Sequence, residues 1–181
     1  MAALTTVANV KQYLSLTGDT TDDLLSRLID AASAFVENWL GRQVLQATVT
    51  EWQSGNGKEA LLLAQSPVVS VESVTVGDQT IRAAATLSEM GWRQTERWLI
   101  YQHGHFAKGM KNVRIEYTAG FDVVPADIEQ AVIDLVSLRF KERDRIGHIS
   151  KSLAGETVSY MISDLSAPTR MALQHYKRVV L

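Results

Sequence analysis

The sequence contains no cysteine and only three prolines among its 181 residues. Without cysteine the chain can form neither a disulfide framework nor a thiolate metal site or nucleophile, which fits folding in a reducing cytoplasm. Three prolines and eleven glycines argue against long disordered or collagen-like segments. Typical domains run to roughly 100–200 residues. We therefore expect one ordered globular domain.

A large excess of charge of one sign is also missing. The 18 basic and 20 acidic side chains leave a formal net charge of −2. Such a chain has no bulk attraction to nucleic-acid phosphates or to an anionic membrane. No apolar run approaches the roughly 20 residues that span a bilayer, and Met1 is not followed by a basic leader. We expect neither secretion nor a membrane partner.

The clearest predicted element is a helix from Asp22 to Leu40. Thr20 and Thr21 can cap it, and Asp22 and Asp23 suit the positive end of its dipole. Gly41 supplies the left-handed stop expected after the last turn. One broad apolar stripe runs along this helix, as expected for packing against a core: Leu24, Leu25, Leu28, Ile29, Ala32, Phe35, Val36, Trp39 and Leu40.

From Gln43 to Phe121 the apolar period changes to two, which predicts strands. Gly77-Asp78 is typical of a hairpin turn, and the phase shift at Glu72-Ser73 indicates a β-bulge. The four tryptophans of the chain look like core residues, although aromatic side chains also anchor interfaces.

A third long helix should begin at Pro125 and run to about Lys141, because proline is favoured at a first helical position. It leads into a locally basic stretch, 139–151, which is usually a solvated helix end but could bind phosphate. The segment 153–162 could be an ordered arm or a strand, and Ser166 and Pro168 start a final helix.

A search for chemistry finds no catalytic signature. His103 and His105 form the one histidine cluster, but a stable zinc or iron site needs at least a third ligand. Gly55-Asn56-Gly57-Lys58 lacks the spacing of a phosphate-binding loop and is typical of a tight turn. We therefore predict no enzymatic activity, no catalytic residues, no metal and no cofactor.

These elements predict an α+β fold, described as a helical bundle of about four helices with a small, mostly antiparallel β-unit inserted between helices 2 and 3. The chain is predicted to form a single domain, 1–181. Its predicted parts are the N-terminal helices (1–42), the β-insertion (43–121), the third helix with its basic end (122–150), and a C-terminal arm and helix (151–181).

The order of these signals resembles the head–tail connector, or adaptor, proteins of long-tailed bacteriophages, prophages and gene transfer agents, which include head completion proteins. The resemblance covers nearly the whole chain. It rests chiefly on the helix end Glu37-Asn38-Trp39-Leu40-Gly41-Arg42 and on the junction Tyr117-Thr118-Ala119-Gly120-Phe121 leading to Pro125. The closing segment Leu173-Gln174-His175-Tyr176-Lys177-Arg178-Val179 also looks like that of the family.

The resemblance implies a structural protein of the virion neck, made in the bacterial host cytoplasm. Its subunits would form a homo-oligomeric ring, twelvefold when assembled, beneath the portal protein. The ring would extend the channel through which DNA passes without sequence-specific contact, and would carry the stopper or tail-completion protein. The residues expected to contact the portal or a neighbouring subunit are Arg139, Lys141, Arg143, Arg145, Lys151, Arg170, Met171, Tyr176, Lys177 and Arg178.

Two other hypotheses come from different classes. The first is a small nucleic-acid-binding module that uses the basic 139–151 stretch, for which salt-dependent binding of duplex DNA would be the evidence. The second is a metal-dependent enzyme built on His103 and His105, which elemental analysis of the purified protein would test.

Overall fold

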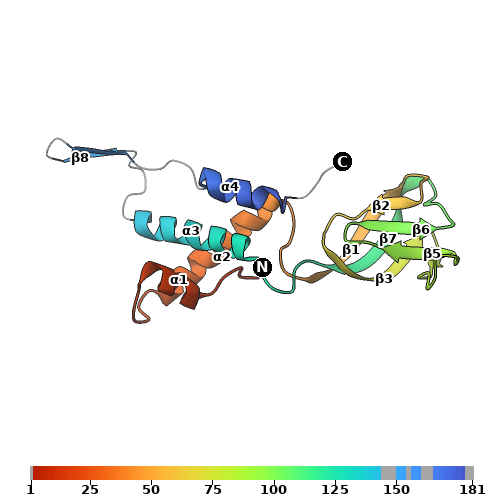
Figure 1. The fold of residues 1–181 in the computed structure, drawn as a ribbon, viewed down its shortest axis with the longest axis horizontal. Coiled ribbons are helices and arrows are strands. Elements are labelled where there is room, and N and C mark those ends of the chain that lie inside the picture. The colour runs from red at the N-terminus through yellow and green to blue at the C-terminus, as the bar shows by residue number, and fades with distance from the viewer. Residues whose placement is uncertain (1, 144–149, 154–155, 160–164, 178–181) are drawn as a thin grey trace. The chain divides into compact units, whose positions relative to one another are not determined.

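The computed structural model describes residues 2–143, 150–153, 156–159 and 165–177 (Figure 1). The chain divides into two compact units. A helical unit is built from residues up to Gly41 and from Val124 onward, and a β-rich unit is Arg42–Val123.

The helical unit contains α1 (Val7–Leu14), α2 (Asp22–Leu40), α3 (Ala126–Glu142) and α4 (Ala167–Gln174). Thr6 caps α1 by accepting a hydrogen bond from the Asn9 N–H at 3.2 Å. The predicted bounds of α2 are confirmed, and Gly41 closes it with φ 69°. Thr21 is the N-cap residue, but its side chain makes no capping hydrogen bond, so the predicted hydroxyl cap is wrong. Pro125 was expected as the first helical residue of α3, but it is the N-cap, so the helix begins one residue later, at Ala126.

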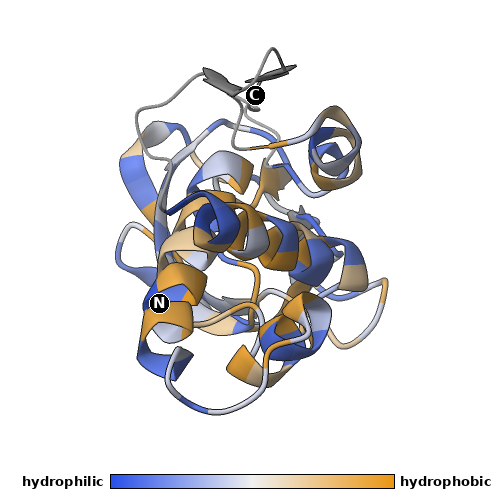
Figure 2. Ribbon diagram, turned by 90° about the vertical axis from the view of Figure 1, so that its left-hand side faces the viewer, coloured by the Kyte–Doolittle hydropathy of each residue, from blue (hydrophilic) through white to orange (hydrophobic). Residues whose placement is uncertain are grey.

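The helices pack through apolar faces, and Figure 2 shows hydrophobic and hydrophilic residues side by side around them. Buried side chains from all four helices form this core: Val10, Leu25, Ile29, Ala32, Val36, Leu40, Ile128, Ala131, Val132, Leu135, Val136, Phe140 and Leu173. Among the described residues, no helix is both long enough and apolar enough to cross a bilayer. The unit also includes a two-stranded hairpin, β8 (Ser150–Leu153) with β9 (Glu156–Ser159).

The β-rich unit contains two antiparallel sheets. The first has the order β1-β7-β3-β4, from β1 (Ala47–Gly55), β7 (Gly109–Ala119), β3 (Val68–Val76) and β4 (Gln79–Ile81). The second has the order β2-β6-β5, from β2 (Ala60–Leu62), β6 (Trp98–Gln102) and β5 (Gly91–Gln94). The register of β3 on β7 shifts between Val71 and Ser73, which confirms the predicted bulge. Gly77, with φ 59°, turns the chain from β3 into β4.

A separate hydrophobic core lies between these strands. Alternate residues of β7, from Val113 to Ala119, are buried, and Leu61, Leu99 and Phe106 pack in the same cluster. Since successive strand residues point to opposite faces, the other face of β7 carries Arg114, Glu116 and Thr118.

The prediction of a helical bundle with a small inserted β-unit is therefore wrong. The fold is α+β and the described residues do form four helices, but the strands build two antiparallel sheets with a hydrophobic core of their own. The physical reason is that an antiparallel pair of sheets buries one apolar face of each strand against the other sheet, so this region needs no helical bundle to cover it.

Candidate interaction surface

Two aromatic side chains of α2 contact two of the basic residues predicted to bind the portal or a neighbouring subunit. Phe35 and Trp39 are four residues apart and so lie on the same side of the helix. The Arg139 guanidinium of α3 lies 5.5 Å from the centre of the Phe35 ring, and the Lys177 ammonium lies 4.9 Å from that of Trp39. Cations at such distances are attracted to the ring faces. We call these four residues the cation–aromatic face.

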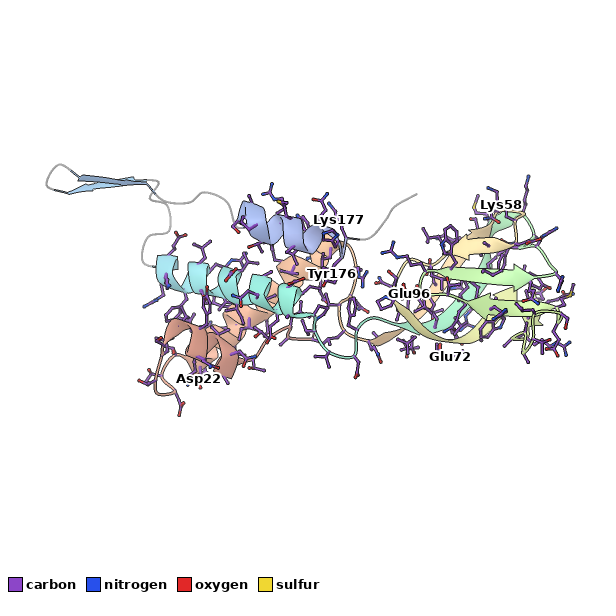
Figure 3. All side chains as sticks on the ribbon, viewed as in Figure 1. Asp22, Lys58, Glu72, Glu96, Tyr176 and Lys177 are labelled. Carbon is purple, nitrogen blue, oxygen red and sulfur yellow. The ribbon has the colours of Figure 1, made fainter. Side chains whose placement is uncertain are left out.

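Tyr176 and Lys177 follow α4 and fasten this end of the chain to the helical unit (Figure 3). The Tyr176 hydroxyl donates a hydrogen bond to the Asp127 carboxylate at the start of α3, at 3.4 Å. Partial burial, followed by the negative charge of Asp127, raises the pKa of Tyr176. Leu173 of α4 is fully buried. The final helix is thus docked on its own unit.

The other predicted contact residues have different surroundings. Arg143 stacks on Phe140 of its own helix, with the guanidinium carbon 4.3 Å from the ring centre, and therefore does not join the cation–aromatic face. Lys141, Arg170 and Met171 are exposed, and Met171 has 72% of its surface accessible. Lys151 lies in β8, where side chains are not described, and Arg145 and Arg178 lie outside the described residues.

A pocket of about 350 Å³ lies among α1, α3 and the start of α4. Its walls are mainly apolar, with Leu135, Leu138 and Leu165 among them, and Tyr13 and Asp134 supply polar groups. The negative charge of Asp134 and a hydrogen bond to its carboxylate raise the pKa of Tyr13. Sequence reasoning missed this pocket, because its lining comes from three elements that are distant along the chain.

The open face of the four-stranded sheet is polar, with one exposed aromatic side chain. Trp52 of β1 is 56% exposed, and the Arg114 guanidinium lies 5.9 Å from the centre of its ring. Trp98 is 41% exposed. The favoured interpretation of the tryptophans as core residues is therefore wrong for these two. Strand alternation directs Trp52 to the face that carries Arg114.

The histidine pair does not gather a set of metal ligands. His103 and His105 are exposed. The His103 Nε2 lies 3.1 Å from the Leu87 carbonyl oxygen, and the His105 Nδ1 lies 4.0 Å from a Glu59 carboxylate oxygen. Within the described part of the chain, no group of three or more histidine, aspartate or glutamate side chains is placed to hold a metal ion.

Comparison with solved structures finds the same fold in particle necks. One match is the neck of a native gene transfer agent particle computed with C12 symmetry, at 19% identity and a TM-score of 0.62, covering 99% of this chain and 91% of that one. The neck of an empty particle computed with C6 symmetry matches at 18% identity and a TM-score of 0.64, covering 100% and 94%. A chain of the native gene transfer agent virion matches at 20% identity and a TM-score of 0.61, covering 98% and 91%.

No curated protein matches the chain. The model of one family, described as head completion protein, matches residues 3–179. That range contains the Glu37–Arg42 helix end and the Tyr117–Pro125 junction on which the predicted resemblance rests, so that prediction is confirmed. Because the match spans nearly the whole chain, the protein belongs to the head completion protein family.

Proposed function

We propose that this protein is a head–tail connector, or adaptor, in the neck of a virion. The observation that carries this function is the family match over residues 3–179. The solved neck structures with the same fold support it. The role is structural rather than catalytic, and family membership favours it over the nucleic-acid-binding alternative.

The subunits assemble as a homo-oligomeric ring. Support comes from the similar neck chains, whose particles were computed with C12 and C6 symmetry. The partners we propose are the portal protein on one side and the stopper or tail-completion protein on the other, with DNA passing through the ring. A subunit with a formal net charge of −2 suits a channel along which DNA slides, because phosphate contacts would hold the DNA.

The proposed portal or neighbour contact includes the exposed side of α4. Arg170 and Met171 are exposed there. The buried Leu173 is two residues after Met171 and therefore points to nearly the opposite side of the helix from it. A methionine 72% exposed beside an arginine offers an adaptable apolar contact with a charge at its edge. Deleting residues 166–181 would remove the buried Leu173 together with the exposed side of α4, and so would disturb folding as well as contact with the portal. Point variants on the exposed side test the contact alone.

The test is the double variant Arg170→Glu with Met171→Glu. Both side chains are exposed, so the subunit should keep its melting temperature, because surface substitutions usually change stability by no more than about 0.5 kcal/mol. We expect it to lose incorporation into portal-bearing heads, measured by particle composition and by negative-stain images of subunit mixed with portal.

A matched control exists in the β-rich unit. Met110 is 90% exposed, and the exposed Lys111 follows it. Met110→Glu with Lys111→Glu makes the same chemical change away from α4, and should leave portal joining intact. Normal incorporation of the α4 variant would contradict the proposed contact.

A further inference from the structure

Arg42 is a buried arginine of the β-rich unit. It comes directly after the left-handed Gly41 that ends α2. Its side chain is 7% exposed. One terminal nitrogen, Nη1, donates a hydrogen bond to the Ser66 hydroxyl at 3.2 Å, and the guanidinium carbon lies 5.4 Å from the centre of the Phe121 ring.

The rest of this guanidinium makes no hydrogen bond to the residues that the structure describes. The Nε and Nη2 atoms are buried and have no acceptor among them. Burial, followed by the like charge of Arg97, lowers the pKa of Arg42. An arginine has five N–H donors in a fixed fork and stays charged in proteins. Among the described residues, this buried positive charge therefore has no carboxylate counter-ion.

Two other cations that the structure describes, Lys11 and Arg114, have carboxylate partners. The Lys11 ammonium lies 3.1 Å from an Asp19 oxygen and 2.8 Å from an Asp22 oxygen, and Arg114 pairs with Glu116. Removing a charge from water without pairing it costs several kcal/mol. A group that bears this cost in the free subunit is typical of a site completed by another molecule.

We propose that Arg42 is the receptor for a carboxylate side chain supplied by a neighbouring copy of this chain, an inference that rests on the proposed ring. The unpaired Nε and Nη2 form the edge of the guanidinium that binds a carboxylate through two parallel hydrogen bonds. The chain has more carboxylates than cations, 20 against 18, so each copy brings such groups to its neighbour.

The depth of the group argues against a DNA phosphate as the ligand. Arg42 is 7% exposed, with Nε and Nη2 buried, so one aspartate or glutamate side chain pairs with it only if the head group turns outward, whereas the duplex backbone needs an open basic surface. The flexible aliphatic stem of arginine lets the head group move toward an incoming carboxylate. In the proposed complex, the Phe121 ring packs beside the ion pair.

The test compares Arg42→Met and Arg42→Lys with Arg93→Met as a matched control, since Arg93 is an exposed arginine of the same unit. Removing an uncompensated charge should leave the melting temperature of the Arg42→Met subunit equal to wild type or higher by about 2–4 °C. Its rings, counted in negative-stain images, should be lost, while Arg42→Lys retains part of the assembly and Arg93→Met all of it. A clear fall in melting temperature, or normal rings from Arg42→Met, would overturn the proposal.

A second measurement tests the Arg42 site in the isolated subunit, without assembly of the oligomeric ring. Sodium acetate, compared with sodium chloride at equal ionic strength, should raise the melting temperature of the wild-type subunit more than that of Arg42→Met, because ligand that binds the folded state stabilises it. Equal shifts in the two proteins would overturn the proposal. If the wild-type protein forms no ring, alone or with portal, the proposed function fails while this measurement still reports on Arg42.

Discussion

At the scale of single residues, buried polar groups fix the connection between β2 and β3. Tyr117 is fully buried on β7, and its hydroxyl donates to the Glu51 carboxylate of β1 while accepting from the Gln65 N–H at 3.1 Å. The same carboxylate accepts from the Ala64 N–H at 3.1 Å and from the Gln53 side-chain amide at 2.7 Å. These contacts hold the segment that leads into β3 against the two long strands.

Substituting Tyr117→Phe should lower the free energy of unfolding by about 1–3 kcal/mol, because it leaves a partly buried carboxylate and a backbone N–H with one partner fewer. Urea unfolding followed by tryptophan fluorescence measures this. Tyr101→Phe is the control, since the Tyr101 ring packs on Phe106 with its centre 5.6 Å away and none of the hydrogen bonds among the described residues involves its hydroxyl. A loss of stability no larger than that of the control would contradict the structural role of the Tyr117 hydroxyl.

At the scale of elements, α4 has one buried side and one exposed side. Ser166 caps it by accepting from the Thr169 N–H at 3.2 Å, and Leu173 is fully buried. A helix of eight residues is unstable alone in water, so its docking must come from these tertiary contacts.

The contrast between Leu173→Ala and Met171→Ala measures that docking. Leu173→Ala should cost about 2–5 kcal/mol, because it removes buried methyl groups and leaves a cavity. Met171→Ala, on the exposed side, should stay within about 0.5 kcal/mol of wild type. Chemical denaturation of both variants gives the comparison, and similar losses would show that α4 does not pack through Leu173.

At the scale of the whole molecule, two compact units each have a hydrophobic core, and the chain enters and leaves the β-rich unit at Arg42 and Val123. In the proposed neck function, each subunit contacts neighbouring subunits, the portal protein and the stopper or tail-completion protein. The exposed side of α4 and the Arg42 site are the surfaces that we propose for two of those contacts.

The single connector domain over 1–181 remains a prediction, and calorimetry tests it. One cooperative domain should unfold in one transition, with equal calorimetric and van't Hoff enthalpies. Two resolved transitions, one moved by Leu173→Ala and the other by Tyr117→Phe, would contradict it.

Local signals in the sequence predicted those features that neighbouring residues decide. Asp22–Leu40 has its own stripe, acidic first turn and glycine stop, so the helix and its end could be located. The Glu72-Ser73 phase shift and the Gly77-Asp78 turn likewise depend on a few adjacent residues. The family was recognisable because its helix end and its junction are short continuous segments.

Contacts between distant segments could not be predicted in this way. The same apolar alternation in 43–121 fits a small insertion or two stacked sheets, and the choice depends on which strands pair, because pairing decides what each face buries. Strand pairing also decides the position of Trp52. Its aromatic side chain favours the core, but its pairing opposite Arg114 on β7 places it on the open face.

The sequence by itself determined the bounds of the Asp22–Leu40 helix, the turns, the bulge and the family, because periodicity and backbone preference act over a few residues. The tertiary structure alone decided that the sheets have their own core, that Lys177 lies on Trp39, and that Arg42 is buried with two nitrogens that find no acceptor among the described residues. Burial and charge pairing depend on groups brought together from distant positions, so they exist only once the chain has folded.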